Sequence, residues 1–218
     1  MTSAREEILG NIRRVLKDRA ADPVQDNRAQ VVPARGQIPH ADQIALFIKE
    51  AERVNATTAR VGDLADVPEA IATFLAANNL PSKVRTGRDE LIRAIPWSDH
   101  SAITVNEGVA RPTDQASVTS AFAAAAETGS LALISGPDSP TSLNYLPDNH
   151  IVVLQTGQIV GSYEEVWQRL REKMGEDWPR AVNWITGPSR TADIEQELLL
   201  GAHGPRRLHV VLVDEETE

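Results

Sequence analysis

The stretch "LHVVLV" (residues 208–213) is the clearest indication of the fold class, because it has the length and the β-branched content of a buried strand. Similar runs occur at TTARV (57–61), KVRT (83–86), SAITV (101–105), SLALIS (130–135), IVVLQ (151–155) and VNWIT (182–186). Segments with helical periodicity lie between them, at about 41–54, 67–78, 88–95, 114–124, 162–174 and 193–200. Strands that alternate with helices predict an α/β fold with a mostly parallel sheet layered with helices. In such a sheet we expect ligands beyond the carboxyl ends of the strands.

The first 39 residues are predicted to form an appendage to this domain. Ser3 and Glu6 have the spacing of a capping box, and apolar residues follow at helical intervals, which predicts an amphipathic helix over 4–19. The stretch ADPVQDNRAQVVPARGQIP (21–39) has three prolines and no periodicity, which is typical of a linker. We therefore expect residues 1–39 to be a helix and linker and residues 40–218 to be the α/β domain. The helix either packs on its own domain or docks on a partner.

The charge and hydropathy of the sequence argue against a nucleic-acid partner, a secretory signal and a membrane span. The formal net charge of −9 and the scattered Lys and Arg residues give no attraction to a polyanion, so we expect no nucleic-acid partner. The N-terminal MTSAREEILGNIRR is charged, without the apolar core of a secretory signal. No apolar run approaches the ~18 residues of a membrane span, so we expect no membrane span and a cytoplasmic location.

Cysteine is absent from the sequence. This excludes disulfides, a thiolate nucleophile and a cysteine-ligated iron–sulfur cluster within the chain. The motifs HExxH, GxGxxG and GxxxxGK[ST] are also absent. The sequence therefore predicts no metal site and no cofactor within this chain.

AAETGSLALISG (125–136) places polar residues directly before a strand. Gly129 permits a sharp turn that aims the carboxylate of Glu127, with Thr128 and Ser130 beside it. A desolvated carboxylate suits a general acid or base, or a nucleophile. Alternatively, Glu127 binds backbone amides and orders the turn.

TGPSRTADIE (186–195) places hydroxyls and a guanidinium before the predicted helix at 193–200. Ser189, Thr191 or Asp193 could cap that helix. Arg190 is the group in this loop that is best suited to a ligand.

Two further loops contain histidines. In GAHGPRRLHVVLV (201–213), His203 suits proton transfer and Arg206 offers a carboxylate a forked partner, whereas His209 is expected to be a packed histidine. The long loop GPDSPTSLNYLPDNH (136–150) ends at His150, for which a structural hydrogen bond is the favoured interpretation.

Four motifs together resemble the lactate utilization protein C family: AETGS (126–130), SLNYLPDNHIVV (142–153), TGPSRTADIE and GAHGPRRLHVVLV, in the family's order. The resemblance implies a fold similar to the glucosamine-phosphate isomerase, ribose-phosphate isomerase and CoA-transferase group. It also implies a role in oxidising L-lactate to pyruvate beside larger iron–sulfur partner proteins. A chain without cysteine fits that division of labour.

These observations lead to two hypotheses. In the first, the chain is an accessory subunit with a small-anion pocket, where Arg190 or Arg206 holds a carboxylate and Glu127 or His203 moves a proton. The remaining predicted substrate-binding residues are Thr128, Gly129, Ser130, Ser189 and Thr191. A non-catalytic form of this hypothesis is also open, in which the same loops order an interface with a partner protein and catalyse no reaction. In the second hypothesis, the chain is a stand-alone enzyme that acts on a small carboxylate, sugar phosphate or acyl-CoA through Glu127 and His203.

Overall fold

The computed structural model describes residues 4–17, 32–99, 102–191, 199–200 and 203–214. The chain divides into two units, Met1–Val31 and Val32–Glu218. The first unit contains helix α1 (Ala4–Lys17), on which Ile8, Ile12 and Val15 are exposed. This agrees with the predicted amphipathic helix over the residues described.

The second unit alternates strands and helices. Its helices are α2 (His40–Arg53), α3 (Val67–Ala77), α4 (Glu90–Ala94), α5 (Ser142–Tyr145) and α6 (Tyr163–Met174), with 3-10 turns η2 (Ala34–Gly36), η3 (Leu64–Asp66), η4 (Trp97–Asp99) and η5 (Thr156–Gln158). Its strands are β1 (Thr57–Val61), β2 (Lys83–Thr86), β3 (Thr104–Glu107), β4 (Ala116–Ser120), β5 (Ala123–Ala125), β6 (Ser130–Ile134), β7 (Asn149–Gln155), β8 (Ile159–Val160), β9 (Val182–Ile185), β10 (Arg190–Thr191), β11 (Leu199–Leu200) and β12 (Arg207–Val213).

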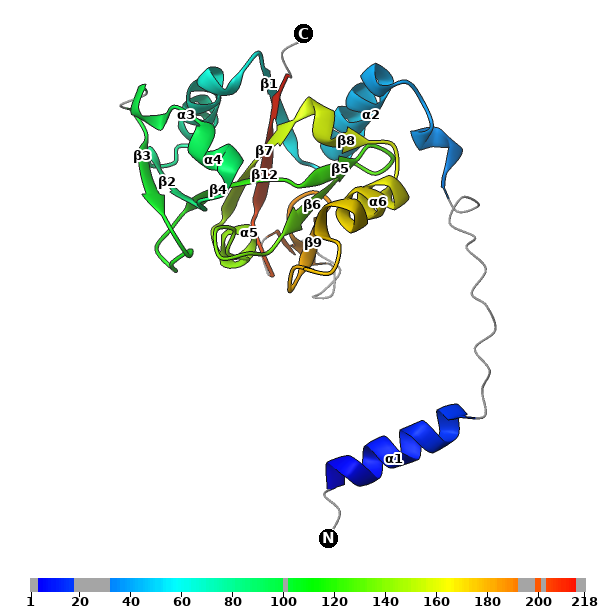
Figure 1. Cartoon of the computed structure of the whole chain (residues 1–218). Coiled ribbons are helices and arrows are strands. Elements are labelled where there is room, and N and C mark those ends of the chain that lie inside the picture. The colour runs from blue at the N-terminus through cyan, green and yellow to red at the C-terminus, as the bar shows by residue number, and fades with distance from the viewer. Residues whose placement is uncertain (1–3, 18–31, 100–101, 192–198, 201–202, 215–218) are drawn as a thin grey trace. The chain divides into compact units, whose positions relative to one another are not determined.

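A six-stranded sheet forms the centre of the second unit, in the order β1-β12-β7-β4-β2-β3 (Figure 1). Every neighbouring pair in it is parallel. The quoted stretch LHVVLV belongs to β12, which pairs with β7 so that Leu208 lies opposite His150 and His209 opposite Ile151. The predicted parallel α/β sheet is therefore confirmed.

Alternate residues of β12 enter two different hydrophobic cores. Val211 and Val213 pack with helix α3 and with α4, whereas Leu208, Val210 and Leu212 pack with α2 and with β6. This period of two is a property of every strand, because successive side chains point to opposite faces. The sheet therefore has α3 and α4 on one face, and α2 and β6 on the other.

A second sheet of four strands, β8-β5-β6-β9, includes β6 and forms a further layer. Strand β6 is antiparallel to β5 and to β9, so two of the predicted strands, SLALIS and VNWIT, lie outside the parallel sheet. The side chains of Val160 and Val166 join a third core that β5 shares with α6. Helix α6 begins as predicted, because Ser162 and Glu165 form a capping box.

The helix predicted over 114–124 is wrong: this segment contains β4 and β5. Strand β4 is the fourth of six strands, and Ala116, Ser117 and Val118 are all buried. A strand that is buried on both faces shows no alternation of polar and apolar residues, so periodicity could not identify it.

The helix predicted over 193–200 is wrong at its end, because Leu199–Leu200 form β11, antiparallel to Arg190–Thr191 of β10. Pairing with β10 supplies these backbone groups with partners that a helix would have supplied locally. Residues 192–198, including Asp193, lie outside the part of the chain that the structure describes.

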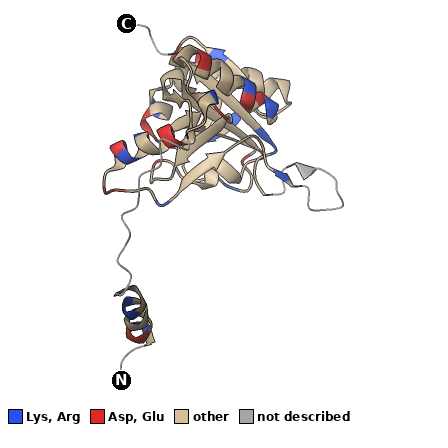
Figure 2. Ribbon diagram, turned by 90° about the vertical axis from the view of Figure 1, so that its right-hand side faces the viewer, with Lys and Arg blue, Asp and Glu red and all other residues tan. Residues whose placement is uncertain are grey.

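Charged residues of both signs are interspersed along the helices and strands (Figure 2). Several of them form exposed ion pairs, such as Arg60 with Asp214 and Arg88 with Glu107. None of the helices in the described ranges is long and apolar enough to cross a membrane.

Candidate functional site

A cavity of about 200 Å³ lies at the amino ends of β7 and β12, and we call it the motif cavity. Three of the four motifs contribute to it directly. Its lining residues are Asn144, Tyr145, His150, Trp184, Ile185, Thr186, Gly187, Pro188, Ser189, His203, Gly204, Pro205 and Leu208. The tertiary structure thus brings together loops that are up to about sixty residues apart in the sequence.

His150 is the buried polar group of the motif cavity. Its side chain is 0% exposed, and its Nε2 lies 2.7 Å from Oγ1 of Thr119, while Nδ1 is buried without a hydrogen-bond partner. Burial lowers the pKa of His150 from 6.5 to about 3, so the imidazole is neutral at neutral pH. Its Nδ1 can therefore donate or accept one hydrogen bond, according to the tautomer.

The fourth motif, AETGS, reaches the motif cavity through a cluster of hydroxyls. Oγ of Ser130 lies 2.8 Å from Oγ1 of Thr128, 2.6 Å from the hydroxyl of Tyr163 and 2.5 Å from Oγ1 of Thr186. Thr186 lines the cavity, whereas Ser130 is completely buried behind it. Thr128 and Ser130 are thus placed to orient Thr186.

Glu127 does not line the motif cavity. It is buried, and its Oε1 accepts a hydrogen bond of 3.0 Å from the backbone N–H of Tyr163, the first residue of α6. A carboxylate at this position also interacts favourably with the helix dipole. The geometry matches the interpretation in which Glu127 binds a backbone amide and orders the turn.

Gly129 shows why the AETGS turn needs glycine. Its φ is +67°, and a Cβ built there would lie 2.3 Å from the backbone N of Ala51 in α2. Backbone atoms cannot move away as a flexible side chain can. The turn is therefore fixed against α2.

Replacing Gly129 with alanine is expected to lower the free energy of unfolding by about 2–4 kcal/mol, which adds the left-handed backbone penalty to the cost of overpacking. Urea unfolding measures the change. Gly175→Ala is the control, because Gly175 has a φ of +54° but nothing within 4 Å of its Cβ position. If both variants lose the same stability, the contact with α2 is not the cause.

Ser189 and His203 are brought together as the sequence hypothesis required. The backbone N–H of His203 donates to Oγ of Ser189 over 3.4 Å, and the N–H of Ser189 donates to the carbonyl of Pro205 over 2.8 Å. The side chain of His203 is exposed, so it lies at the rim of the motif cavity.

The two arginines expected to hold a carboxylate do not line the motif cavity. The guanidinium of Arg190 donates to the backbone carbonyl of Val54, and Arg206 lies 3.7 Å from Asp148. Thr191 belongs to β10, and its side chain is outside the described part. The lining residues that the structure describes therefore include no Lys or Arg.

His150 and its partner Thr119 are not among the site residues predicted from the sequence. Thr119 lies in β4, which was predicted to be a helix, so its neighbourhood could not be anticipated. The available signal was the position of His150 directly before the apolar run IVVLQ, at a strand start. His209 is a packed histidine as predicted, 5% exposed and stacked on Phe74.

Ligands were expected beyond the carboxyl ends of the strands, but the motif cavity lies at the amino ends. The carboxyl edge has its own cavity of about 520 Å³, where the hydroxyl of Ser120 donates to Oδ1 of Asp89 over 2.7 Å. None of the four motifs supplies a side chain with an unpartnered buried nitrogen there. Within the described residues, no group of three His, Asp or Glu side chains could hold a metal ion.

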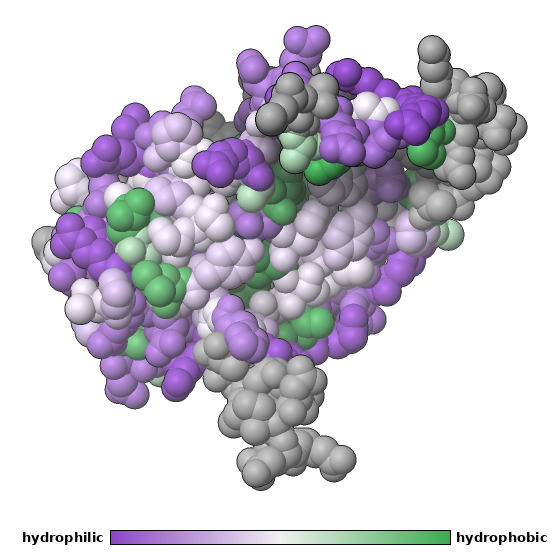
Figure 3. Space-filling view, turned by 90° about the horizontal axis from the view of Figure 1, so that it is seen from below, coloured by the Kyte–Doolittle hydropathy of each residue, from purple (hydrophilic) through white to green (hydrophobic). Residues whose placement is uncertain are grey.

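Figure 3 views the molecule from the side of the amino ends. Hydrophobic residues form small separate patches there among hydrophilic and neutral ones. The visible face therefore resembles an ordinary polar surface with recessed apolar residues more than a broad apolar interface.

The parallel sheet, the second sheet and the cavity between sequence motifs define a layered α/β protein with a ligand-sized site. Residues 113–213 match the LUD domain family model, so this part of the chain is similar to the LUD domain. This confirms the family resemblance of the four motifs.

Curated relatives named lactate utilization protein C match part of the chain. The protein from Halalkalibacterium halodurans is 34% identical over 116 residues, which are 51% of this chain and 50% of the relative. The one from Exiguobacterium sp. is 34% identical over 119 residues, 54% of this chain and 51% of the relative. The chain thus matches about half the length of these relatives.

A solved structure shows the same fold. It is a DUF162 family protein from Deinococcus radiodurans, with a TM-score of 0.61 and 24% identity, and the match covers 81% of this chain and 99% of that one. At this identity the likeness concerns the fold alone.

Proposed function

We propose that this chain acts in lactate utilization and that its motif cavity binds a small 2-hydroxy or 2-keto acid such as L-lactate or pyruvate. Electrons from lactate would leave through iron–sulfur partner proteins, since this sequence has no cysteine to ligate a cluster. The names of the relatives support the pathway. The proposal places the chain in the cytoplasm as an accessory subunit.

The proposal for the ligand rests on His150, which lines the motif cavity and whose Nδ1 is buried without a hydrogen-bond partner. A buried polar atom normally has a partner, so this nitrogen is suited to a ligand atom. Because the imidazole is neutral, it supplies no charge to offset a buried carboxylate, so it is better suited to a hydroxyl or a keto oxygen. The oxygen at C2 of lactate or pyruvate has this chemistry.

The size and polarity of the motif cavity fit the same class of ligand. Its volume of about 200 Å³ lies below the ~300–1,000 Å³ typical of larger ligands, so it suits a molecule of a few heavy atoms. Oγ of Ser189 and Oγ1 of Thr186 supply further polar contacts. The carboxylate of the ligand would face the rim, where His203 is exposed.

Thermal unfolding with L-lactate, pyruvate and propionate tests this proposal, because propionate has the carboxylate but no oxygen at C2. Lactate or pyruvate at 100 times its Kd is expected to add about 2.7 kcal/mol of apparent stability, and propionate at the same concentration much less. His150→Phe should remove this preference. His209→Phe, on the other face of the sheet, should retain it.

Equal stabilisation by propionate would contradict the role of the oxygen at C2. A preference that survives in a folded His150→Phe variant would show that the ligand binds elsewhere.

A further inference from the structure

A second buried histidine lies one residue further along the paired strands. Leu208 is opposite His150, so the next residue, His209, points to the other face of the sheet. There its ring stacks on Phe74 of α3, with centroids 4.3 Å apart and an angle of 13° between the rings. His150 and His209 therefore line separate cavities on opposite faces of the sheet.

The hydrogen bonds of His209 leave one buried nitrogen without a partner. Nδ1 lies 2.8 Å from Oγ1 of Thr57, whose hydroxyl donates to the carbonyl of Leu208. In the tautomer in which that hydroxyl accepts from the ring, the proton is on Nδ1 and Nε2 is an acceptor. Nε2 is buried and has no hydrogen-bond partner. Burial lowers the pKa of His209 to about 4, so the ring stays neutral at neutral pH.

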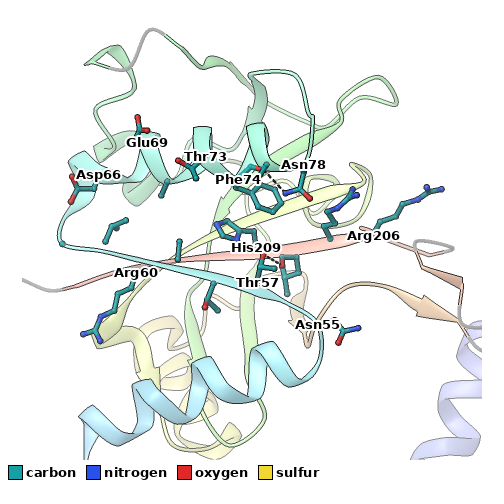
Figure 4. A pocket seen from close by; sticks show the side chains of 18 residues that line it. Asn55, Thr57, Arg60, Asp66, Glu69, Thr73, Phe74, Asn78, Arg206 and His209 are labelled. Atoms are coloured by element: carbon teal, nitrogen blue, oxygen red, sulfur yellow. Dashed lines mark hydrogen bonds between the residues drawn. The ribbon is translucent and has the colours of Figure 1, made fainter.

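His209 lines a groove of about 840 Å³ between α3 and the strands β1 and β12, and we call it the α3 groove. Small residues of its walls, Ala59, Ala70 and Ala77, leave the space open. In Figure 4, Thr57, Phe74 and His209 lie in the middle of the groove. A groove of this volume accommodates a ligand much larger than the motif cavity does.

The two ends of the α3 groove differ in charge. Arg60, Asp66 and Glu69 lie toward one end, and Arg206, Asn55 and Asn78 toward the other (Figure 4). Arg60 is paired with Asp214 at 2.8 Å, whereas Arg206 is 60% exposed and approaches Asp148 only to 3.7 Å. Arg206 therefore retains donors for an anion.

We propose that the α3 groove binds a flat ring compound that has an N–H or O–H donor on the ring and an anionic group, as purine nucleotides do. The donor of the ring compound forms a hydrogen bond with Nε2 of His209, and its anionic group forms an ion pair with Arg206. The lone pair of Nε2 lies in the imidazole plane, so a donor on a flat ring can approach edge-on beside Phe74. Among the described residues, Leu208, whose backbone carbonyl lies by Thr57, is the one that lines both the α3 groove and the motif cavity.

Titration calorimetry with AMP, adenosine and inorganic phosphate tests this proposal. AMP is expected to bind at least tenfold more tightly than adenosine or phosphate, because only AMP has both the ring donor for His209 and the anionic group for Arg206. His209→Phe keeps the stacked ring but removes the acceptor, so AMP should bind about fivefold more weakly.

Two alanines of α3 provide a matched pair of variants. Ala77 lines the groove and Ala76 does not, although both are exposed. Ala77→Leu should weaken AMP binding at least tenfold, and Ala76→Leu should leave it unchanged. This pair also keeps the test valid if His209→Phe does not fold.

Three results would overturn the proposal: no binding of AMP, phosphate binding as tightly as AMP, or equal affinities in the two alanine variants. His150→Phe should not alter AMP binding. This separates a failure at the α3 groove from a failure of the proposed lactate site.

Discussion

Replacing Asp114 with alanine is expected to lower the free energy of unfolding by about 3–5 kcal/mol, because it leaves a buried guanidinium without a carboxylate partner. The side chains of Arg85 and Asp114 are 8% and 7% exposed, with Nε of Arg85 2.8 Å from Oδ2. A second contact of 3.2 Å joins Nη2 to Oδ1. The hydrogen bond with Arg85 holds the pKa of Asp114 below its ordinary value, despite the opposing effect of burial.

Urea unfolding measures this loss, and an exposed pair provides the control. Arg88 and Glu107 are each 52% exposed and 2.8 Å apart, so Glu107→Gln should cost less than about 1 kcal/mol. The double variant Arg85→Met/Asp114→Leu should recover most of the stability, because it removes both buried charges. A loss in Asp114→Ala no larger than in Glu107→Gln would show that the buried pair is not needed.

Between pH 6.5 and pH 5 the protein is expected to lose up to about 2 kcal/mol of unfolding free energy for each buried histidine. The pKa of His150 is lowered to about 3 and that of His209 to about 4, from 6.5. In this range the unfolded chain binds protons that the folded protein does not. The stabilisation is therefore complete above pH 6.5 and is lost as the pH falls toward 4 and 3.

Urea unfolding at several pH values checks this effect. The carboxylates Glu50 and Asp114 also have lowered pKa values, Glu50 through hydrogen bonds from Arg53 and Arg35, but their ordinary values are 4.5 and 3.8. Their losses thus begin below the range of the histidines. The double variant His150→Phe/His209→Phe should flatten the slope between pH 6.5 and 5. An unchanged slope would exclude these histidines as its origin.

Local patterns predicted the elements whose signals lie within one turn or one strand. The capping box of Ser162 and Glu165 identified α6, and the apolar runs identified β1, β7 and β12. Strand β4 was missed because burial on both faces removes the alternation that marks a strand. Leu199 was missed for another reason, since a pairing with Thr191 across eight residues is not visible in periodicity.

The sequence alone predicted the parallel α/β class, the family resemblance and the loops that carry the shared motifs, since these depend on local composition and motif order. Which side chains of those loops lie together depends on how the layers of the fold pack. In the folded protein, Arg190 donates a hydrogen bond to the carbonyl of Val54, and Glu127 accepts one from the backbone N–H of Tyr163. It also buries His150 and His209 on opposite faces, each with one free nitrogen. The reason is that hydrogen bonds form between groups that are close in space. Residues far apart in the chain become neighbours only when the layers of the fold pack together.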